Sequence, residues 1–237
     1  MKKYSLIFLL LFVFCSGDSE AIEDNQSLTI ISNDVLIETE ETSTSTTEIV
    51  QIDSFQGTVY VVQKDESEVG YLAPKQFLNA GLENVKGVTS EIIGEFTLEL
   101  SECDQSDSCL YITNLLIRVD ISTLKSKSSI RDSAIKSQWL ESKLFPEAVF
   151  KLDELVIPNK NFDSKVEDTI VGKLSIREIE LDTPFSITAS LVNDTIRIIG
   201  FTEIDTTWFG FDAPTKFNAW EVLNPIGITV DLVAKQK

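Results

Sequence analysis

Eight segments rich in β-branched and aromatic residues follow one another along the chain, separated mainly by short polar stretches with Gly, Pro, Asn or Asp. They are residues 57–64, 89–100, 109–122, 147–158, 168–181, 184–193, 194–204 and 227–235. No regular helices alternate with them, so consecutive strands are expected to pair as an antiparallel meander, with Asn193 and Asp194 in one hairpin turn. Such a meander closes most economically on itself. We therefore predict an all-β fold, a closed or nearly closed antiparallel barrel of about eight strands with room for one small ligand.

Residues 129–145, "SIRDSAIKSQWLESKLF", break the strand pattern. Ser129 and Asp132 resemble a capping box, and apolar residues from Ile130 to Trp139 recur roughly at helical spacing. The pattern favours a short amphipathic helix over one open end of the barrel. In the alternative interpretation, Arg131 and Asp132 form a catalytic or binding pair.

Cys103 and Cys109 bracket the loop "DQSDS" between two strand candidates. In an exported protein this pair is expected to form a disulfide that pins one hairpin. A redox or metal-binding pair would need closer spacing or additional ligands.

The N-terminus has the pattern of an export signal: two lysines precede the apolar run of residues 4–14, which is too short to span a bilayer as a helix. We predict a signal peptide over residues 1–15, with Cys15 as a possible lipidation site that would tether the mature protein to a membrane. Ordinary secretion, with cleavage after Gly17 or Ala21, is the alternative. The protein is expected in the periplasm or cell envelope, or secreted.

Residues 16–48 are acidic, rich in Ser and Thr, and end in "ETEETSTSTTE" before Ile49. Such a segment cannot bury enough apolar surface to offset the entropy of ordering it, so it is expected to be a disordered spacer. The folded domain is then predicted over residues 49–237.

Composition excludes several functions. The chain has no histidine, which removes Ser-His-Asp and Cys-His catalysis and the usual ligand of zinc sites. Its net charge of -18 disfavours nucleic acid as a partner. We expect neither catalytic activity nor a metal site nor a cofactor.

The stretch from Thr123 to Leu155, "TLKSKSSIRDSAIKSQWLESKLFPEAVFKLDEL", resembles the most recognisable part of the YceI-like family of exported, lipocalin-like barrels that bind polyisoprenoid lipids. The matching residues are Leu124, Ser126, Arg131, Asp132, Leu140, Phe145, Pro146, Ala148 and Phe150. Four more segments fall in family order, at residues 67–77, 87–96, 172–185 and 204–214, so the resemblance runs from about Ile49 to the C-terminus. The chain departs from the family at Ser133 and Ala134, where His is often found.

The resemblance implies that the barrel holds a long apolar lipid, such as a polyisoprenoid or a quinone-like molecule. Each CH₂ group that is buried contributes about 0.8 kcal/mol of binding free energy, so a prenyl chain is a suitable ligand for an apolar interior. Aromatic residues near strand ends and in non-strand segments are the candidates for lining the site, each with an alternative place in the ordinary core. They are Phe77, Trp139, Phe145, Phe150, Trp208, Phe209 and Phe211. The alternative function is an interaction or stress-response module whose barrel is filled by its own side chains.

Overall fold

The structure is a computed structural model that describes residues 57–104, 106–158, 165–216 and 218–237. The predicted signal peptide, the lipidation site Cys15 and the predicted spacer all lie outside the described residues.

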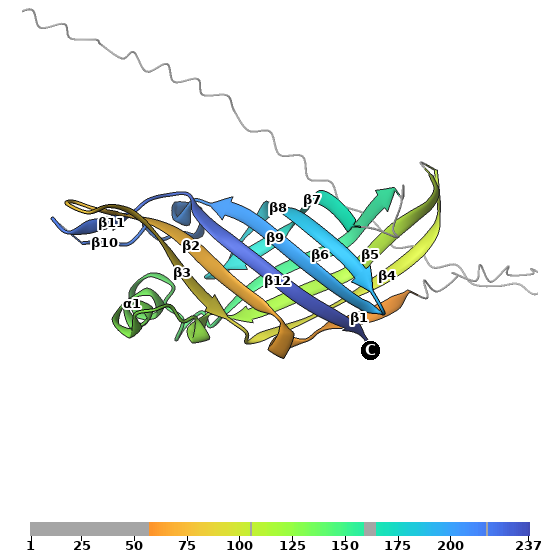
Figure 1. Ribbon diagram of the computed structural model, residues 1–237, viewed down its shortest axis with the longest axis horizontal. Coiled ribbons are helices and arrows are strands. Elements are labelled where there is room, and N and C mark those ends of the chain that lie inside the picture. Colours follow the sequence, from red (N-terminus) through yellow and green to blue (C-terminus); the bar gives the residue numbers. More distant parts are fainter. Residues whose placement is uncertain (1–56, 105, 159–164, 217) are drawn as a thin grey trace, which may run out of the picture. The chain divides into compact units, whose positions relative to one another are not determined.

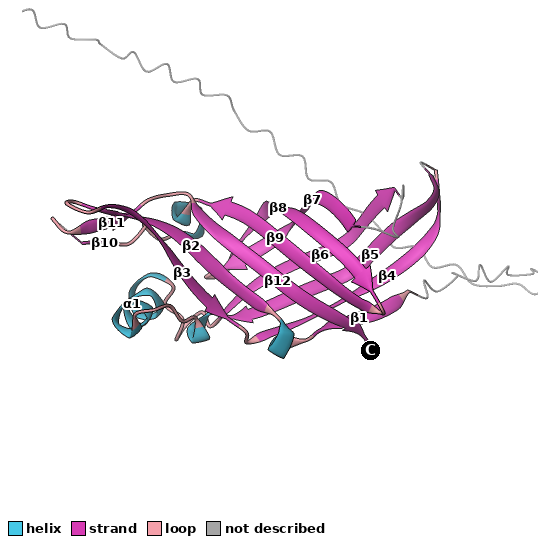
Figure 2. Cartoon of the chain, viewed as in Figure 1, coloured by secondary structure: helices cyan, strands magenta, loops and turns pink. Residues whose placement is uncertain are grey.

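Eight strands form a closed antiparallel ring (Figures 1 and 2). They are β1 (Thr58–Val62), β4 (Ile92–Cys103), β5 (Ser106–Asp120), β6 (Glu147–Pro158), β7 (Lys165–Ile176), β8 (Ile179–Val192), β9 (Thr195–Ile204) and β12 (Ile226–Gln236). They pair in the order β1-β4-β5-β6-β7-β8-β9-β12, and β12 pairs back with β1. Each strand corresponds to one of the eight predicted segments, so the predicted barrel is confirmed.

The barrel wall is extended at one end by a hairpin absent from the eight predicted strands. It consists of β2 (Glu68–Phe77) and β3 (Gly81–Thr89), and β2 continues beyond β1 along the same partner, β12. Pro74 lies in β2 between the stretch that pairs with β12 and the stretch that pairs with β11 (Trp220–Val222). A proline lacks the N–H that a fully paired strand needs, so this position tolerates it. The short strand β10 (Thr215–Lys216) pairs with β11.

The turn between β7 and β8 lies at Arg177 and Glu178, inside the segment 168–181 that was predicted to be one strand. Both residues have positive φ angles, of 51° and 65°, as a tight two-residue hairpin turn requires. Pro184, which had marked a strand boundary, lies within β8 opposite Val171. The predicted turn at Asn193 and Asp194 is confirmed, with φ angles of 49° and 61°.

The predicted helix is present at one end of the barrel, close to the β2–β3 hairpin (Figure 1). It comprises α1 (Ser129–Ala134) and the π-helical turn η3 (Ile135–Trp139). Its N-cap is Ser128, whose Oγ accepts a hydrogen bond from the Arg131 N–H, and not Ser129 as the sequence pattern suggested. Three 3₁₀ turns complete the fold: η1 (Lys64–Glu66), η2 (Ile121–Thr123) and η4 (Thr206–Phe209).

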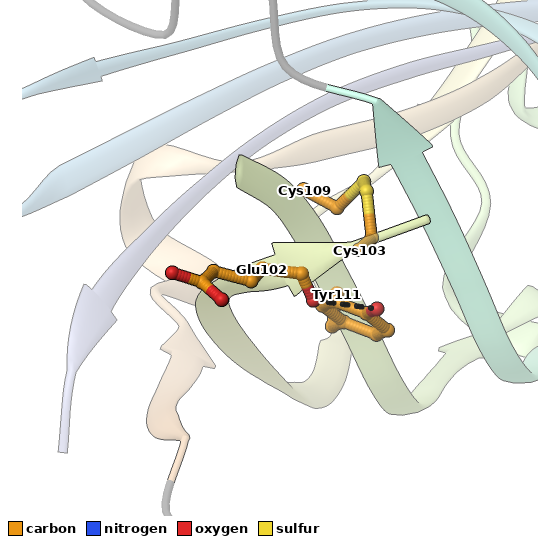
Figure 3. The surroundings of a disulfide bond; sticks show 4 residues. All are labelled: Glu102, Cys103, Cys109 and Tyr111. Carbon is orange, nitrogen blue, oxygen red and sulfur yellow. Dashed lines mark hydrogen bonds between the residues drawn. A yellow bond between two sulfur atoms is a disulfide. The ribbon is translucent and has the colours of Figure 1, made fainter. Parts of the chain in front are cut away.

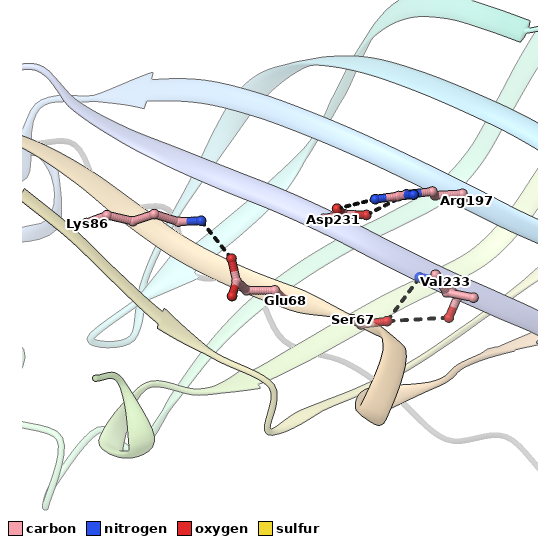
Figure 4. A network of polar contacts seen from close by, with 6 residues as sticks. All are labelled: Ser67, Glu68, Lys86, Arg197, Asp231 and Val233. Carbon is pink, nitrogen blue, oxygen red and sulfur yellow. Dashed lines mark hydrogen bonds and ion pairs between the residues drawn. The ribbon is translucent and has the colours of Figure 1, made fainter. Parts of the chain in front are cut away.

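The corner between β1 and β2 is fixed by one buried hydroxyl. The Ser67 Oγ accepts a hydrogen bond from the Val233 N–H over 3.0 Å (Figure 4). The same hydroxyl donates to the Gln63 carbonyl over 2.7 Å. This contact ties the corner to β12 where that strand changes partner from β2 to β1. One strand can thereby close the ring and also carry the extra hairpin.

The hairpin between β4 and β5 is closed by the predicted disulfide, Cys103–Cys109 (Figure 3). Cys109 is fully buried, and the Tyr111 hydroxyl donates a hydrogen bond to the Glu102 carbonyl over 3.4 Å beside the bridge. This hairpin lies at the barrel end opposite α1 (Figure 1).

Candidate ligand-binding site

The barrel encloses a cavity of about 560 Å³. Inward-facing aliphatic residues of the ring strands make up most of its wall, and it extends from α1 to Leu110 and Ile157 near the disulfide end. Strand alternation places these apolar side chains inside, while charged residues occupy the outer face. The volume lies within the usual range for small-molecule sites, and the elongated apolar interior suits a hydrocarbon chain.

The cavity opens at the α1 end. Only two of its lining residues are exposed: Ile130 of α1, with 84% of its surface accessible, and Lys216 of β10. At the disulfide end, lining residues such as Ile157 and Leu110 are buried or half-buried. A ligand is therefore expected to enter between α1 and the β10–β11 hairpin.

The few polar groups of the cavity gather near this mouth, and among its described lining residues none is acidic. Lys75, Arg131 and Lys216 supply the positive charges. The Lys75 Nζ lies 4.0 Å from the ring centroid of Trp220 and 4.6 Å from that of Phe77. Burial, followed by repulsion from Arg131, lowers the pKa of Lys75, and Glu83 opposes the shift.

Tyr71 is the one phenol in the cavity wall. Its hydroxyl is buried and forms no hydrogen bond within the described residues. Burial raises its pKa, and the nearby Arg131 and Ser126 oppose the shift. The ring packs across Gly87 on β3, where an added Cβ would lie 2.4 Å from it. The cavity thus offers a neutral hydroxyl donor next to positive charges.

The Arg131–Asp132 pair has a structural role in the described residues. Both Asp132 carboxylate oxygens accept hydrogen bonds from Ser126, one from its hydroxyl and one from its N–H over 3.0 Å. The Arg131 Nε donates to the Ser126 Oγ over 3.0 Å. These bonds fix the chain entering α1 and leave the guanidinium of Arg131 at the cavity wall.

The structure places the seven predicted aromatic residues in different environments. Trp139, Phe150 and Phe211 line the cavity. The other four are outside the lining: Phe209, the last residue of η4, is fully buried in the core, Trp208 is 58% exposed, Phe77 packs beside Lys75 at the end of β2, and Phe145 lies against Arg177. Aromatic residues at strand ends support the loops of the rim, and for this reason most of them do not reach the interior.

Sequence reasoning from aromatic residues missed the main lining, which is aliphatic. Ile196, Ile198 and Gly200 illustrate it: they alternate along β9 and all three face the cavity. The period of two in the strand sequences carried this signal.

Within the described segments, no helix has the length and apolar character needed to cross a membrane. The same residues contain no cluster of acidic, Cys or His side chains that could hold a metal ion.

Comparison with known proteins agrees with this architecture. No curated protein matches the chain. Among solved structures, BcnA of Burkholderia cenocepacia superposes with a TM-score of 0.55 at 15% identity, covering 73% of this chain and 99% of BcnA. A polyisoprenoid binding domain from Saccharophagus degradans, implicated in plant cell wall breakdown, gives a TM-score of 0.55 at 8% identity and covers 76% of this chain and 99% of that domain.

At these identities the structural likeness shows the fold alone. The family model of the YceI-like domain, however, matches residues 60–234, which include nearly all of the barrel. The chain therefore belongs to the YceI-like family.

Proposed function

We propose that this protein binds a long apolar lipid, a polyisoprenoid or quinone-like molecule, inside its barrel. The observation that carries the proposal is the cavity of about 560 Å³, whose wall is almost wholly apolar among the described residues. Each buried CH₂ of a ligand contributes about 0.8 kcal/mol, so a chain of several isoprene units gains enough to bind without any specific polar contact. The name of the Saccharophagus domain, a polyisoprenoid binding domain of the same fold, agrees with this ligand class.

The alternative of a filled barrel without a ligand has less support. Its interior side chains would have to occupy the axis of the barrel, whereas a cavity of about 560 Å³ lies there, with Ile187, Gly200 and Val230 among its lining residues. A binding role also accounts for Arg131 and Asp132 without assigning catalysis to them, because their polar atoms bond to Ser126.

The proposed setting is outside the cytoplasm, with Cys15 lipidated and residues 16–48 acting as a spacer. The apolar run before Cys15 and the acidic, Ser/Thr-rich composition after it support this part of the proposal. Metabolic labelling with a radioactive fatty acid, compared between the native chain and Cys15→Ser, tests the tether. Label that persists in the variant overturns it.

Native mass spectrometry of the full chain purified from its own membrane tests the ligand. The expected result is an adduct that organic extraction releases and that fragments as a prenyl chain. Protein that carries no extractable lipid and does not take up added polyprenol or quinone overturns the proposal and favours the interaction module.

A further inference from the structure

The lysines of this chain divide by position. Seven of the thirteen in the described residues form ion pairs with carboxylates on the barrel wall, as Lys86 does with Glu68 over 2.7 Å (Figure 4). The other six form none with the described residues, and all of them lie in the segments around the mouth. They are Lys75, Lys125, Lys127, Lys136, Lys143 and Lys216.

Most of these unpaired charges lie on the α1 segment, residues 125–144. It carries five cations and only two anions, a net charge of +3 within a chain of net charge -18. Both anions are engaged: Asp132 with Ser126, and Glu141 with Arg177. The exposed lysines of the segment therefore present their positive charge to solvent.

Large apolar side chains are exposed in the same region. On the α1 segment, Ile130 is 84% exposed and Leu144 is 72% exposed. Leu78 and Leu82, at the turn between β2 and β3, are also exposed, and this turn lies at the same end of the barrel as α1 (Figure 1). Isolated exposed Leu and Ile residues are common, but several at the end of the barrel where an apolar cavity opens indicate an interaction surface.

We propose that this surface, the α1 segment together with the β2–β3 turn, docks on the headgroup region of a bilayer that contains anionic lipids. A surface with exposed Leu and Ile flanked by lysines fits such an interface, because burial of apolar area and attraction to anionic headgroups act together. The β2–β3 turn adjoins the β10–β11 side of the mouth, where the Leu78 N–H donates to the Ala219 carbonyl over 3.2 Å. That side also carries Asp212 and Glu221, so the contact is centred on α1 and the turn lies at its edge.

Continuity with the cavity identifies a bilayer, rather than a protein, as the partner. Among the described residues, Ile130 is the most exposed large apolar residue, and it also lines the cavity. With Ile130 among the acyl chains, an apolar ligand passes from the leaflet into the barrel without crossing water. Docking on a bilayer goes beyond the proposed ligand binding, and the contact with vesicles can be measured without any ligand in the cavity.

The three tryptophans make the contact observable in the full chain. Trp139 in η3, Trp208 in η4 and Trp220 in β11 all belong to segments around the mouth. Phospholipids with brominated acyl chains quench tryptophan only at close range, so quenching reports the approach of this end however the N-terminus is attached. The probe is vesicles of brominated phosphatidylcholine, alone or mixed with phosphatidylglycerol.

We expect strong quenching only when phosphatidylglycerol is present. The variant Lys125→Gln/Lys127→Gln/Lys143→Gln is expected to require about tenfold or more lipid for half-maximal quenching, since each lysine near an anionic surface contributes severalfold. The matched control, Lys165→Gln/Lys235→Gln/Lys237→Gln, removes three paired lysines away from α1 and is expected to leave the lipid requirement unchanged. Ile130→Ser/Leu144→Ser is expected to reduce quenching, while Leu191→Ser/Val192→Ser, beside the turn at the opposite end, is not.

Equal quenching with and without phosphatidylglycerol overturns the proposal. An equal rise in the lipid requirement of the lysine variant and of its control overturns it as well. Protein that sediments with vesicles while its tryptophans stay unquenched is attached through another part and also overturns it. Failure of the proposed lipid binding can be distinguished from failure of docking: in that case purified protein takes up no polyprenol, although its tryptophans are still quenched by vesicles.

Discussion

Arg177, in the tight turn between β7 and β8, forms an ion pair with Glu141, in the loop that follows η3. The same guanidinium donates to the Gly210 carbonyl over 3.1 Å and lies 5.8 Å and 5.7 Å from the ring centroids of Phe145 and Phe211. One side chain thereby joins the loop after η3, the β7–β8 turn and the segment after η4. The helical segment is tied to the barrel wall on this side of the mouth.

This pair is expected to stabilise the rim more than an exposed pair does. The side chain of Arg177 is only 19% exposed, whereas that of Arg197, which pairs with Asp231 across the outer wall, is 58% exposed (Figure 4). A double-mutant cycle with Arg177→Ala and Glu141→Ala should give a coupling free energy of about 1 to 2 kcal/mol in urea unfolding. The control cycle on Arg197 and Asp231 should give a smaller coupling free energy, because water and salt screen an exposed ion pair. Equal coupling energies would contradict the structural role of Arg177.

The cavity is expected to be blocked by a single substitution on β9. At Gly200 an added Cβ would make only ordinary contacts, the nearest being 3.4 Å from Val230. Gly200→Leu should therefore fold and should take up much less polyprenol, as measured by native mass spectrometry. At Gly172, in contrast, a Cβ would lie 2.3 Å from the Phe150 ring and 2.9 Å from the Lys151 carbonyl. Gly172→Ala should cost about 1 to 3 kcal/mol of stability. Full uptake by a folded Gly200→Leu variant would count against the barrel as the site.

The disulfide is expected to stabilise the domain without affecting the mouth. Cys103 and Cys109 are six residues apart, and closing so short a loop contributes about 2 kcal/mol through the unfolded state. Reduction, or Cys103→Ala/Cys109→Ala, should lower the free energy of unfolding by about this amount, measured as a shift of the urea midpoint. Lipid uptake should persist below the new midpoint, because the bridge lies at the opposite end from α1.

Tyr71 is expected to make the domain sensitive to alkali. Burial raises its pKa in the folded state above the unfolded value of 10.0, so its contribution to stability is complete below pH 10 and is lost as the pH rises through the folded pKa. Tyr71→Phe should unfold at a higher pH than the native chain, because it removes the group whose ionisation burial opposes, and should keep the native stability at neutral pH to within about 1 kcal/mol. Urea titrations at neutral and alkaline pH test this. If the Tyr71→Phe variant has the same unfolding midpoint at alkaline pH as the native chain, the sensitivity to alkali comes from other groups, such as Tyr60, whose pKa is also raised by burial.

The eight barrel strands could be predicted because each carries its own pattern of alternating and β-branched residues. The β2–β3 hairpin could not be predicted in this way, since Gly70 and Pro74 lower its strand propensity and its pairing depends on β12, more than a hundred residues away in sequence. Phe209 and Phe150 show the limit for the site. Both are aromatic and close to strand ends, yet Phe209, within η4, is buried in the core, whereas Phe150 faces the cavity. Only the three-dimensional path of the loops distinguishes them.

The volume of the cavity inside the barrel could not be predicted from the sequence either. It depends on how the inward side chains of opposite strands add up across the ring, and strand patterns record only which way each side chain points.

The closure of the ring by β12 has a consequence for how the domain folds. This strand, Ile226–Gln236, pairs with β9, β2 and β1. Its pairing with β1 places Gln236 opposite Tyr60. Until it arrives, β1 and β9 remain open edges and the apolar interior faces water. Because the decisive contacts join the two ends of the domain, folding is expected to be slow and to complete only after the whole chain is available. A chain shortened before Ile226 would remain an open, aggregation-prone sheet.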